Sequence, residues 1–126
     1  MVPTNLRYTN DHEWVRVDGD VATVGITAYA ADQLGDIVFV ELPEVGRTLA
    51  RAGAFGVVES VKAVSDLFAP VGGEVIETNA ALTASPELVN SSPYDDGWML
   101  RVRMATGADL DGLLDPATYD ALIAAG

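Results

Sequence analysis

Short runs of alternating apolar and polar residues, separated by turn-forming residues, restrict the chain to a mainly β fold. Residues 12–17 and 21–26 alternate with a period of two on either side of Asp18-Gly19-Asp20, and this pattern predicts a β-hairpin. Repeated short strands joined by Gly-rich and Pro-rich turns are typical of packed antiparallel sheets. Further extended segments are expected at 36–42, 48–68, 74–77 and 98–103.

Two helical segments are expected between these strands. Thr27 is placed to cap a short helix over 28–34, and Gly35 follows where helices commonly end. Residues 83–96 are rich in turn-forming residues, which predicts an irregular loop with one helical turn at 86–89. These helices are too short to alter the mainly β assignment.

A C-terminal helix is expected to complete the fold. Asp115 and Pro116 have the residue types that favour the cap and the first position of a helix. We expect this helix to pack over the sheet through one side. That side would carry Tyr119, Leu122 and Ile123. At 126 residues, the chain is interpreted as a single domain spanning 1–126.

The charge of the chain limits its partners. The formal net charge is −12 and the sequence pI is near 4.1, so polyanions such as nucleic acid and anionic membranes are disfavoured. No apolar run approaches membrane-spanning length, and the N-terminus lacks the apolar core of a signal peptide. The chain has no cysteine, which fits a reducing compartment. We expect a monomer in the cytoplasm.

The sequence supplies few groups for catalysis. It has one histidine, no thiol, no Gly-rich phosphate loop after a strand, and no histidine pair at metal-ligand spacing. His12 has no visible partner and is interpreted as a packing or capping residue. We therefore expect no catalytic residues and no metal site, and a carrier or binding module rather than an enzyme.

Lys62 is the only lysine in the chain, and the other basic side chains are arginines. A lysine amine can be acylated once a modifying enzyme removes its proton, whereas a guanidinium stays charged and poorly nucleophilic. β-Branched residues flank Lys62 on both sides, as in two strands meeting at a tight turn. The pattern favours an attachment point at a hairpin tip. The alternative is a compositional preference for arginine that leaves one surface lysine by chance.

The residues around Lys62 belong to a longer series of matching segments. Glu59-Ser60-Val61-Lys62-Ala63 resembles the lipoylation site of the glycine cleavage system H-protein family. Four other segments, in the same order as in that family, also resemble it: His12–Val15, Val24–Thr27, Leu34–Pro43 and Asn90–Trp98. The resemblance extends from about Leu6 to Tyr119. Five collinear segments are much more specific than a lysine motif alone.

The resemblance implies a barrel-sandwich hybrid of the lipoyl/biotinyl-carrier type, with two packed sheets and short helices. It also implies that Lys62 carries lipoate in amide linkage. Lipoate-attaching enzymes would recognise the turn formed by the neighbouring residues, which are Glu59, Ser60, Val61 and Ala63. For Glu59, an ordinary exposed strand carboxylate is an equally good interpretation.

The resemblance further implies a shuttle without turnover of its own. A pyridoxal-phosphate-dependent glycine decarboxylase would load an aminomethyl group onto the lipoyl arm. A tetrahydrofolate-dependent aminomethyltransferase would remove the one-carbon unit and release ammonia. A flavin-dependent dihydrolipoyl dehydrogenase would then reoxidise the dithiol.

Glu13 and Asp66 correspond, through the resemblance, to residues of the cleft that shelters the loaded arm. A free nitrogen lone pair on the aminomethyl group can expel the thiolate, and water destroys the resulting iminium ion. Carboxylates that keep this nitrogen protonated would prevent the loss. The alternative for Glu13 and Asp66 is that both are solvated surface acids.

Other functions remain open at this point. A biotin carrier usually has methionines beside its lysine, whereas Val61 and Ala63 flank Lys62. A lipoyl domain of a 2-oxoacid dehydrogenase typically has Asp-Lys-Ala at the turn and lies in a longer chain. An H-like protein that relays lipoate to other enzymes would match the same segments. A small enzyme using His12 and carboxylates would keep its activity after Lys62→Arg.

Overall fold

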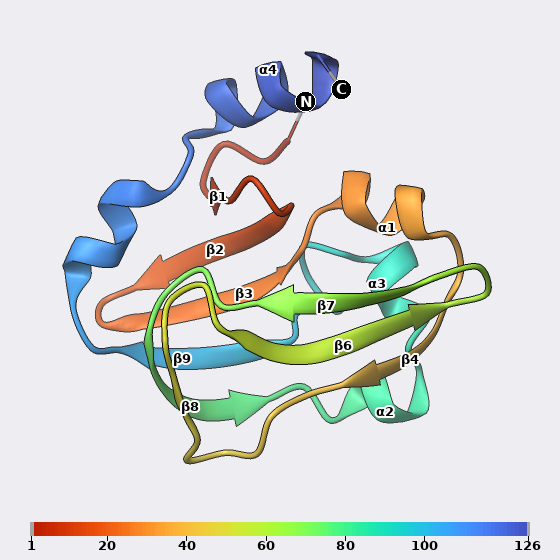
Figure 1. Ribbon diagram of the computed structural model, residues 1–126, viewed down its shortest axis with the longest axis horizontal. Coiled ribbons are helices and arrows are strands. Elements are labelled where there is room, and N and C mark those ends of the chain that lie inside the picture. The colour runs from red at the N-terminus through yellow and green to blue at the C-terminus, as the bar shows by residue number, and fades with distance from the viewer. Residues whose placement is uncertain (1, 126) are drawn as a thin grey trace.

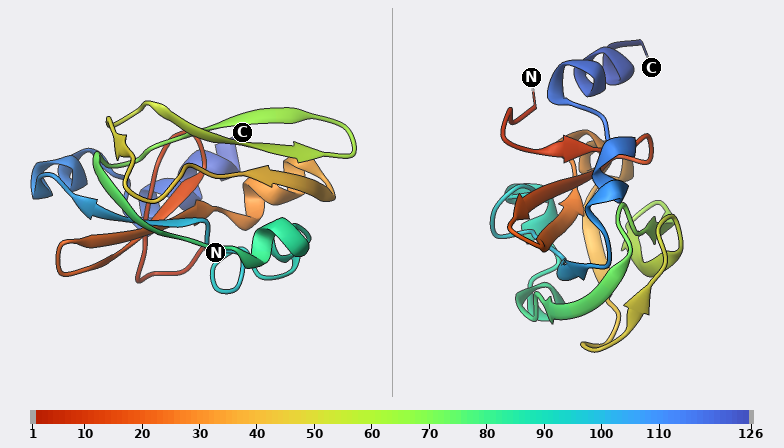
Figure 2. Two further views of the ribbon diagram at one scale, coloured as in Figure 1. Left: turned by 90° about the horizontal axis from the view of Figure 1, so that it is seen from below. Right: turned by 90° about the vertical axis from the view of Figure 1, so that its left-hand side faces the viewer.

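The computed structural model describes residues 2–125 and folds them into two antiparallel sheets that pack against each other (Figure 1; Figure 2, left). The larger sheet has the strand order β1 (Arg7–Tyr8), β2 (Glu13–Asp18), β3 (Val21–Ile26), β9 (Leu100–Met104), β8 (Gly73–Thr78), β5 (Thr48–Leu49). The smaller sheet has the order β4 (Ile37–Glu41), β6 (Ala54–Ser60), β7 (Val64–Phe68). The prediction of a mainly β fold with two packed sheets is confirmed.

The core lies between the two sheets, because alternate side chains of each strand point inward. Val24 of β3 and Val75 of β8 come from the larger sheet, and Val58 of β6 comes from the smaller one; all three are fully buried in a single apolar cluster. The predicted β2–β3 hairpin is present, and Gly19 in its turn adopts a φ of 63°, which favours glycine. The hairpin predicted from the alternating pattern is therefore confirmed.

The expected β segment over 48–68 is divided in the structure. Its first part, β5, pairs with β8 in the larger sheet, whereas β6 and β7 form a hairpin in the smaller sheet. The chain changes sheets through a turn in which Ala52 has a φ of 68°. This left-handed conformation is uncommon for alanine, so the residue types give little sign of the turn.

The helix over 28–34 is present as α1 (Ala28–Leu34), and the Thr27 side chain accepts a hydrogen bond from the N–H of Ala30 as expected. The helical turn predicted at 86–89 corresponds to the short helix α3 (Leu88–Ser91), which begins two residues later, whereas the short helix α2 (Ala81–Ala84) was not predicted. The last strand begins at Leu100 rather than at residue 98. Within residues 2–125, no helix is long and apolar enough to cross a membrane.

The C-terminal helix α4 (Pro116–Ala125) follows the six-residue 3-10 helix η1 (Gly107–Gly112). Asp115 caps α4 by accepting a hydrogen bond from the N–H of Thr118 at 2.7 Å. Tyr119 is fully buried and stacks on Tyr8 of β1, with ring centroids 4.6 Å apart. The expectation for Leu122 is wrong, since this side chain is 38% exposed. The helix packs against β1, at the edge of the larger sheet, rather than over its centre.

Candidate functional site

Lys62 lies in the turn that joins β6 to β7, as the sequence predicted. The N–H of Ser60 donates to the carbonyl of Ala63 at 2.8 Å, which closes the hairpin. The Ser60 hydroxyl oxygen also accepts hydrogen bonds from the N–H groups of Lys62 at 3.3 Å and Ala63 at 3.0 Å. Ser60 therefore fixes the backbone of Lys62 while leaving its side chain free.

The Lys62 side chain is exposed, and its stem lies over the end of α1. A Cβ placed on Gly35 would lie 3.4 Å from Lys62 Cε, an ordinary contact distance, so the lysine stem passes close to Gly35. The N–H of Val61 donates to the carbonyl of Asp36 at 3.0 Å, which holds the turn against the segment that follows α1. In Figure 1 the β6–β7 hairpin extends beyond α1. The sequence indicated Gly35 only as a helix end; its contact with Lys62 was missed.

Apolar side chains surround the turn on the solvent side. Val61 and Val64 are 69% and 67% exposed. In the smaller sheet, Glu59 is paired on one side with Phe39, which is 47% exposed, and on the other side with Val64. Glu59 is thus half-buried between apolar neighbours rather than a fully solvated carboxylate.

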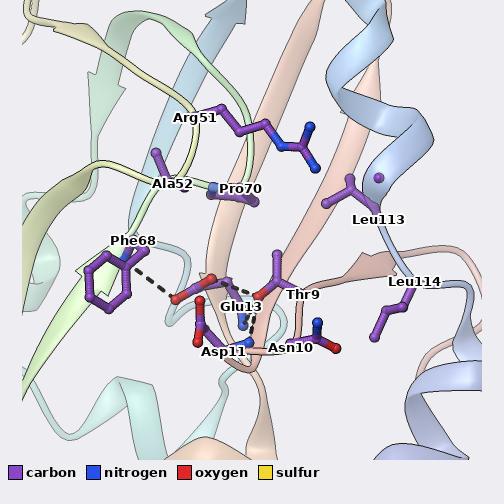
Figure 3. A pocket seen from close by; sticks show the side chains of 12 residues that line it. Thr9, Asn10, Asp11, Glu13, Arg51, Ala52, Phe68, Pro70, Leu113 and Leu114 are labelled. Carbon is purple, nitrogen blue, oxygen red and sulfur yellow. Dashed lines mark hydrogen bonds between the residues drawn. The ribbon is translucent and has the colours of Figure 1, made fainter.

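Glu13, the first residue of β2, is buried, with 2% of its surface exposed. Each oxygen of its carboxyl group accepts one hydrogen bond, from the Thr9 hydroxyl at 2.7 Å and from the N–H of Phe68 at 3.4 Å (Figure 3). Phe68 is the last residue of β7, so Glu13 connects the larger sheet to the smaller one. It is not a solvated surface acid.

Burial raises the pKa of Glu13 from 4.5 to about 7. The hydrogen bonds from Thr9 and Phe68 act in the opposite direction because they stabilise the charged form, and the negative charge of Asp11 adds to the increase. A carboxyl group with a pKa in this range can change its protonation when a cation binds beside it near neutral pH.

Glu13 lies at the wall of a pocket of about 170 Å³. Thr9 and Asp11 contribute the turn before β2, Arg51 comes from the β5–β6 connection, and Leu114 comes from the segment between η1 and α4. Figure 3 shows Thr9 and Asp11 beside the Glu13 carboxyl group, with Arg51 and Leu114 farther away on the pocket wall. With the segment at the end of β7 that includes Phe68, the pocket is formed by four segments that are distant in sequence.

Asp66 does not line this pocket. It is exposed on β7, where it pairs with Val57, two residues before Phe68. Side chains two residues apart in a strand share a face, so Asp66 and Phe68 point to the same side of the smaller sheet. The structure thus brings Glu13 to the end of β7 and leaves Asp66 on the open part of the strand, nearer to the Lys62 turn.

His12 has a structural role, in agreement with its interpretation as a packing residue. Its Nδ1 atom lies 2.8 Å from the Tyr119 hydroxyl, which also lies 2.8 Å from the Thr27 hydroxyl. Burial lowers the pKa of His12, with a smaller opposing effect of Asp11. The described residues contain no cluster of three or more His, Cys, Asp or Glu side chains that could hold a metal ion.

Comparison with known proteins identifies the family. The family model for the glycine cleavage H-protein matches residues 6–125. The chain belongs to the glycine cleavage H-protein family. Proteins of this family carry a lipoyl-lysine and are non-catalytic components of the glycine cleavage system. The chain is accordingly a lipoyl carrier of that system rather than an enzyme, as the sequence indicated.

Individual relatives agree over almost the whole chain. The glycine cleavage system H protein of Phenylobacterium zucineum is 62% identical over 94% of this chain and 98% of its own length. That of Symbiobacterium thermophilum is 56% identical over 99% of this chain and 98% of its own. A crystal structure of a glycine cleavage system H protein from Mycobacterium marinum superposes with a TM-score of 0.90 at 39% identity, covering 98% of this chain and 99% of that one.

Proposed function

We propose that Lys62 carries the lipoyl group of this H-protein family member, and that Glu13 and Asp66 protect the aminomethyl cargo between enzymes. The observation that carries the proposal is the position of β7, which begins beside the Lys62 turn and ends with the Phe68 N–H on the Glu13 carboxyl group. One strand therefore connects the attachment point to a buried acid.

The residues at the turn fit a lipoyl group. Lys62 is exposed, its backbone is held by Ser60, and its stem rests on Gly35, so a modifying enzyme can reach the amine. When bound in amide linkage, the lipoyl group would supply a disulfide that is reduced as one of its sulfurs accepts the aminomethyl unit, and a dithiol would remain once that unit has been passed on. Acylation removes the lysine charge. The exposed valines beside the turn then offer an apolar surface along which a neutral arm can lie.

The distance between the two ends of β7 suits a tethered cargo. Four residue steps separate Val64 from Phe68, which corresponds to about 13 Å at the usual strand rise. Asp66 lies midway on the open face of the strand, and Glu13 lies buried at its end. A cationic cargo moving along β7 would meet first an exposed carboxylate and then a buried one.

Of the two carboxylates, Glu13 should attract such a cation more strongly. Its carboxyl group is removed from water, so its charge is screened little and an ammonium beside it is strongly attracted. The ammonium in turn remains protonated, and its nitrogen has no lone pair with which to expel the thiolate. Glu13 thus stabilises the cargo by charge, while Leu114 and the other pocket walls limit the access of water.

The attachment site is tested by intact mass. Protein incubated with lipoate, ATP and a lipoate-attaching enzyme should gain the mass of one lipoyl group, and Lys62→Arg should gain nothing. Lys62→Arg retains the positive charge and the hairpin, which makes it a matched control for folding. A lipoyl adduct on Lys62→Arg, or none on the parent protein, would contradict the assignment.

The protective role is tested by the lifetime of the loaded carrier. Glu13→Gln and Asp66→Asn should release formaldehyde and ammonia faster than the parent, with the larger effect at the buried Glu13. Glu44→Gln, which changes an exposed acid on a distant turn, is the matched control. Parent-like lifetimes for both Glu13→Gln and Asp66→Asn would refute the protection.

We further propose that the carrier acts as a cytoplasmic monomer. In this role it visits glycine decarboxylase, the aminomethyltransferase and dihydrolipoyl dehydrogenase in turn, and lipoate-attaching enzymes modify it. The net charge of −12 supports the monomer because like-charged copies repel one another. Light scattering at low ionic strength should give the mass of one chain.

A further inference from the structure

Thr9 stands next to Glu13 in a tight turn between β1 and β2. The N–H of Thr9 donates to the Glu13 carbonyl at 3.0 Å, and the N–H of His12 donates to the Thr9 carbonyl at 3.2 Å. His12 has a φ of 68°, as expected for the last residue of a three-residue hairpin loop. The turn therefore has one defined geometry, which sets the position of the Thr9 side chain.

The direction of the Thr9 hydroxyl proton follows from its neighbours. A hydroxyl group has one proton and two acceptor sites. The Thr9 oxygen accepts hydrogen bonds from the N–H groups of Asp11 at 3.2 Å and Glu13 at 3.1 Å, which use both acceptor sites. Its proton is then left for the Glu13 carboxyl oxygen at 2.7 Å, a distance typical of a hydroxyl bonded to a charged carboxylate.

The Ser60 hydroxyl group has a similar environment but donates its proton to a different kind of acceptor. The Ser60 oxygen also accepts from two backbone N–H groups of its turn, but it donates to the carbonyl of Ala63. There the hydroxyl group serves the turn alone. At Thr9 the proton is directed to the buried acid of the pocket.

Other ionisable groups lie on the elements around Glu13. Asp11 lies on the same turn, and Arg51 lines the pocket from the β5–β6 connection. On α4, burial raises the pKa of Tyr119 to about 12, with the negative charge of Glu13 as one of the smaller causes. His12 contacts Tyr119 on that side. Among the groups around Glu13, the Thr9 hydroxyl and the Phe68 N–H are the hydrogen-bond donors recorded to its carboxyl oxygens.

We propose that Thr9 is a positioning residue, whose hydroxyl holds the Glu13 carboxylate ionised and directed into the pocket. This inference rests on the proposed role of Glu13 toward the cationic cargo. Thr9 itself does not contact the cargo. It acts by favouring the charged form of Glu13, which burial alone would disfavour.

The test is a titration of the Glu13 side-chain carboxyl carbon by NMR in the full-length protein. Thr9→Val removes the donor, and the midpoint should rise by about one pH unit, which is the effect of one hydrogen bond to a charged group. Thr9→Ser should restore the parent midpoint. Thr9→Ala also removes the donor and has a smaller side chain, so it should raise the midpoint as well and provides a second variant if Thr9→Val does not fold.

Thr106→Val is the matched control, because the Thr106 hydroxyl caps η1 and contacts no carboxylate. It should leave the Glu13 midpoint unchanged. An unchanged midpoint in Thr9→Val and Thr9→Ala would overturn the proposal, since a threonine that only stabilises the turn would not affect this titration.

The lifetime of the loaded, lipoylated carrier separates this proposal from the role of Glu13. The pH below which cargo is lost should rise in Thr9→Val by the same amount as the Glu13 midpoint. If the midpoint rises but neither Thr9→Val nor Glu13→Gln shortens the lifetime, Thr9 positions Glu13 and the protective role of Glu13 fails. If Glu13→Gln alone shortens the lifetime and the midpoint is constant, the positioning role fails.

Discussion

Replacing Glu13 with glutamine should change how the stability of the protein depends on pH. The folded state raises the pKa of Glu13 from 4.5 to about 7, so the folded protein binds a proton more tightly than the unfolded chain. The contribution of this proton is fully present below about pH 4.5 and is lost as the pH rises through about 7. The parent protein therefore loses stability over this interval, and Glu13→Gln does not incur that loss.

The size of the effect follows from the two pKa values. At about 1.4 kcal/mol per pKa unit, a difference of roughly 2.5 units corresponds to about 3 kcal/mol over the whole interval. Part of this is already lost at about pH 5, so about 2.5 kcal/mol should remain between about pH 5 and pH 8.

Urea unfolding of Glu13→Gln and the parent at several pH values measures this difference. A constant offset is expected as well, because the amide of glutamine cannot accept from both Thr9 and Phe68. The other ionisable groups titrate in the same way in both proteins, so their effects cancel in the difference. Only the pH-dependent part of the difference therefore reports on Glu13. Glu44→Gln controls for the change in net charge. A difference between Glu13→Gln and the parent that is independent of pH would refute the account of Glu13 as a buried acid.

Three further substitutions test the turn, the sheet and the C-terminal helix. Ser60→Ala should slow lipoylation of Lys62 by about fivefold, because the turn loses hydrogen bonds that stabilise it by about 1 kcal/mol. A time course of intact mass measures the rate, and an unaltered rate would contradict the role of Ser60. A Cβ on Gly25 would lie 2.6 Å from the Trp14 ring, so Gly25→Ala should cost about 1–3 kcal/mol in urea unfolding. A cost near zero would show that the indole can move aside. Tyr119→Phe should cost about 1–2 kcal/mol in the same assay, since the removed hydroxyl bonds to two partners, and a neutral result would mean that water replaces it.

The attachment site could be predicted because its signals are local. Lys62 is chemically unique in the chain, and the turn that holds it is formed by its own neighbours, with Ser60 as the main contact. The β2–β3 hairpin and the caps of α1 and α4 are also determined by adjacent residues. In each case the interaction spans only a few positions, so residue types alone indicate it.

The cleft could not be predicted in the same way. Glu13 is held by a residue far along the chain, since the N–H of Phe68 donates to its carboxyl group, and no local pattern indicates that contact. The division at Ala52 was missed because alanine rarely adopts the conformation that it has there. Leu122 fits a helical stripe, yet α4 lies at the edge of the sheet and leaves that position exposed. For Thr9, the only local indication of its contact with Glu13 was their spacing of four residues across a turn.

The role of β7 has a consequence for how such chains can diverge. Inserting one residue into this strand would turn its side chains to the opposite face, and inserting two would move the attachment turn about 7 Å farther from Glu13. Neither change can be corrected by the arm, whose chemical length is the same in every lipoylated protein. Relatives should therefore tolerate insertions and deletions in many loops while keeping the number of residues between Lys62 and Phe68 constant.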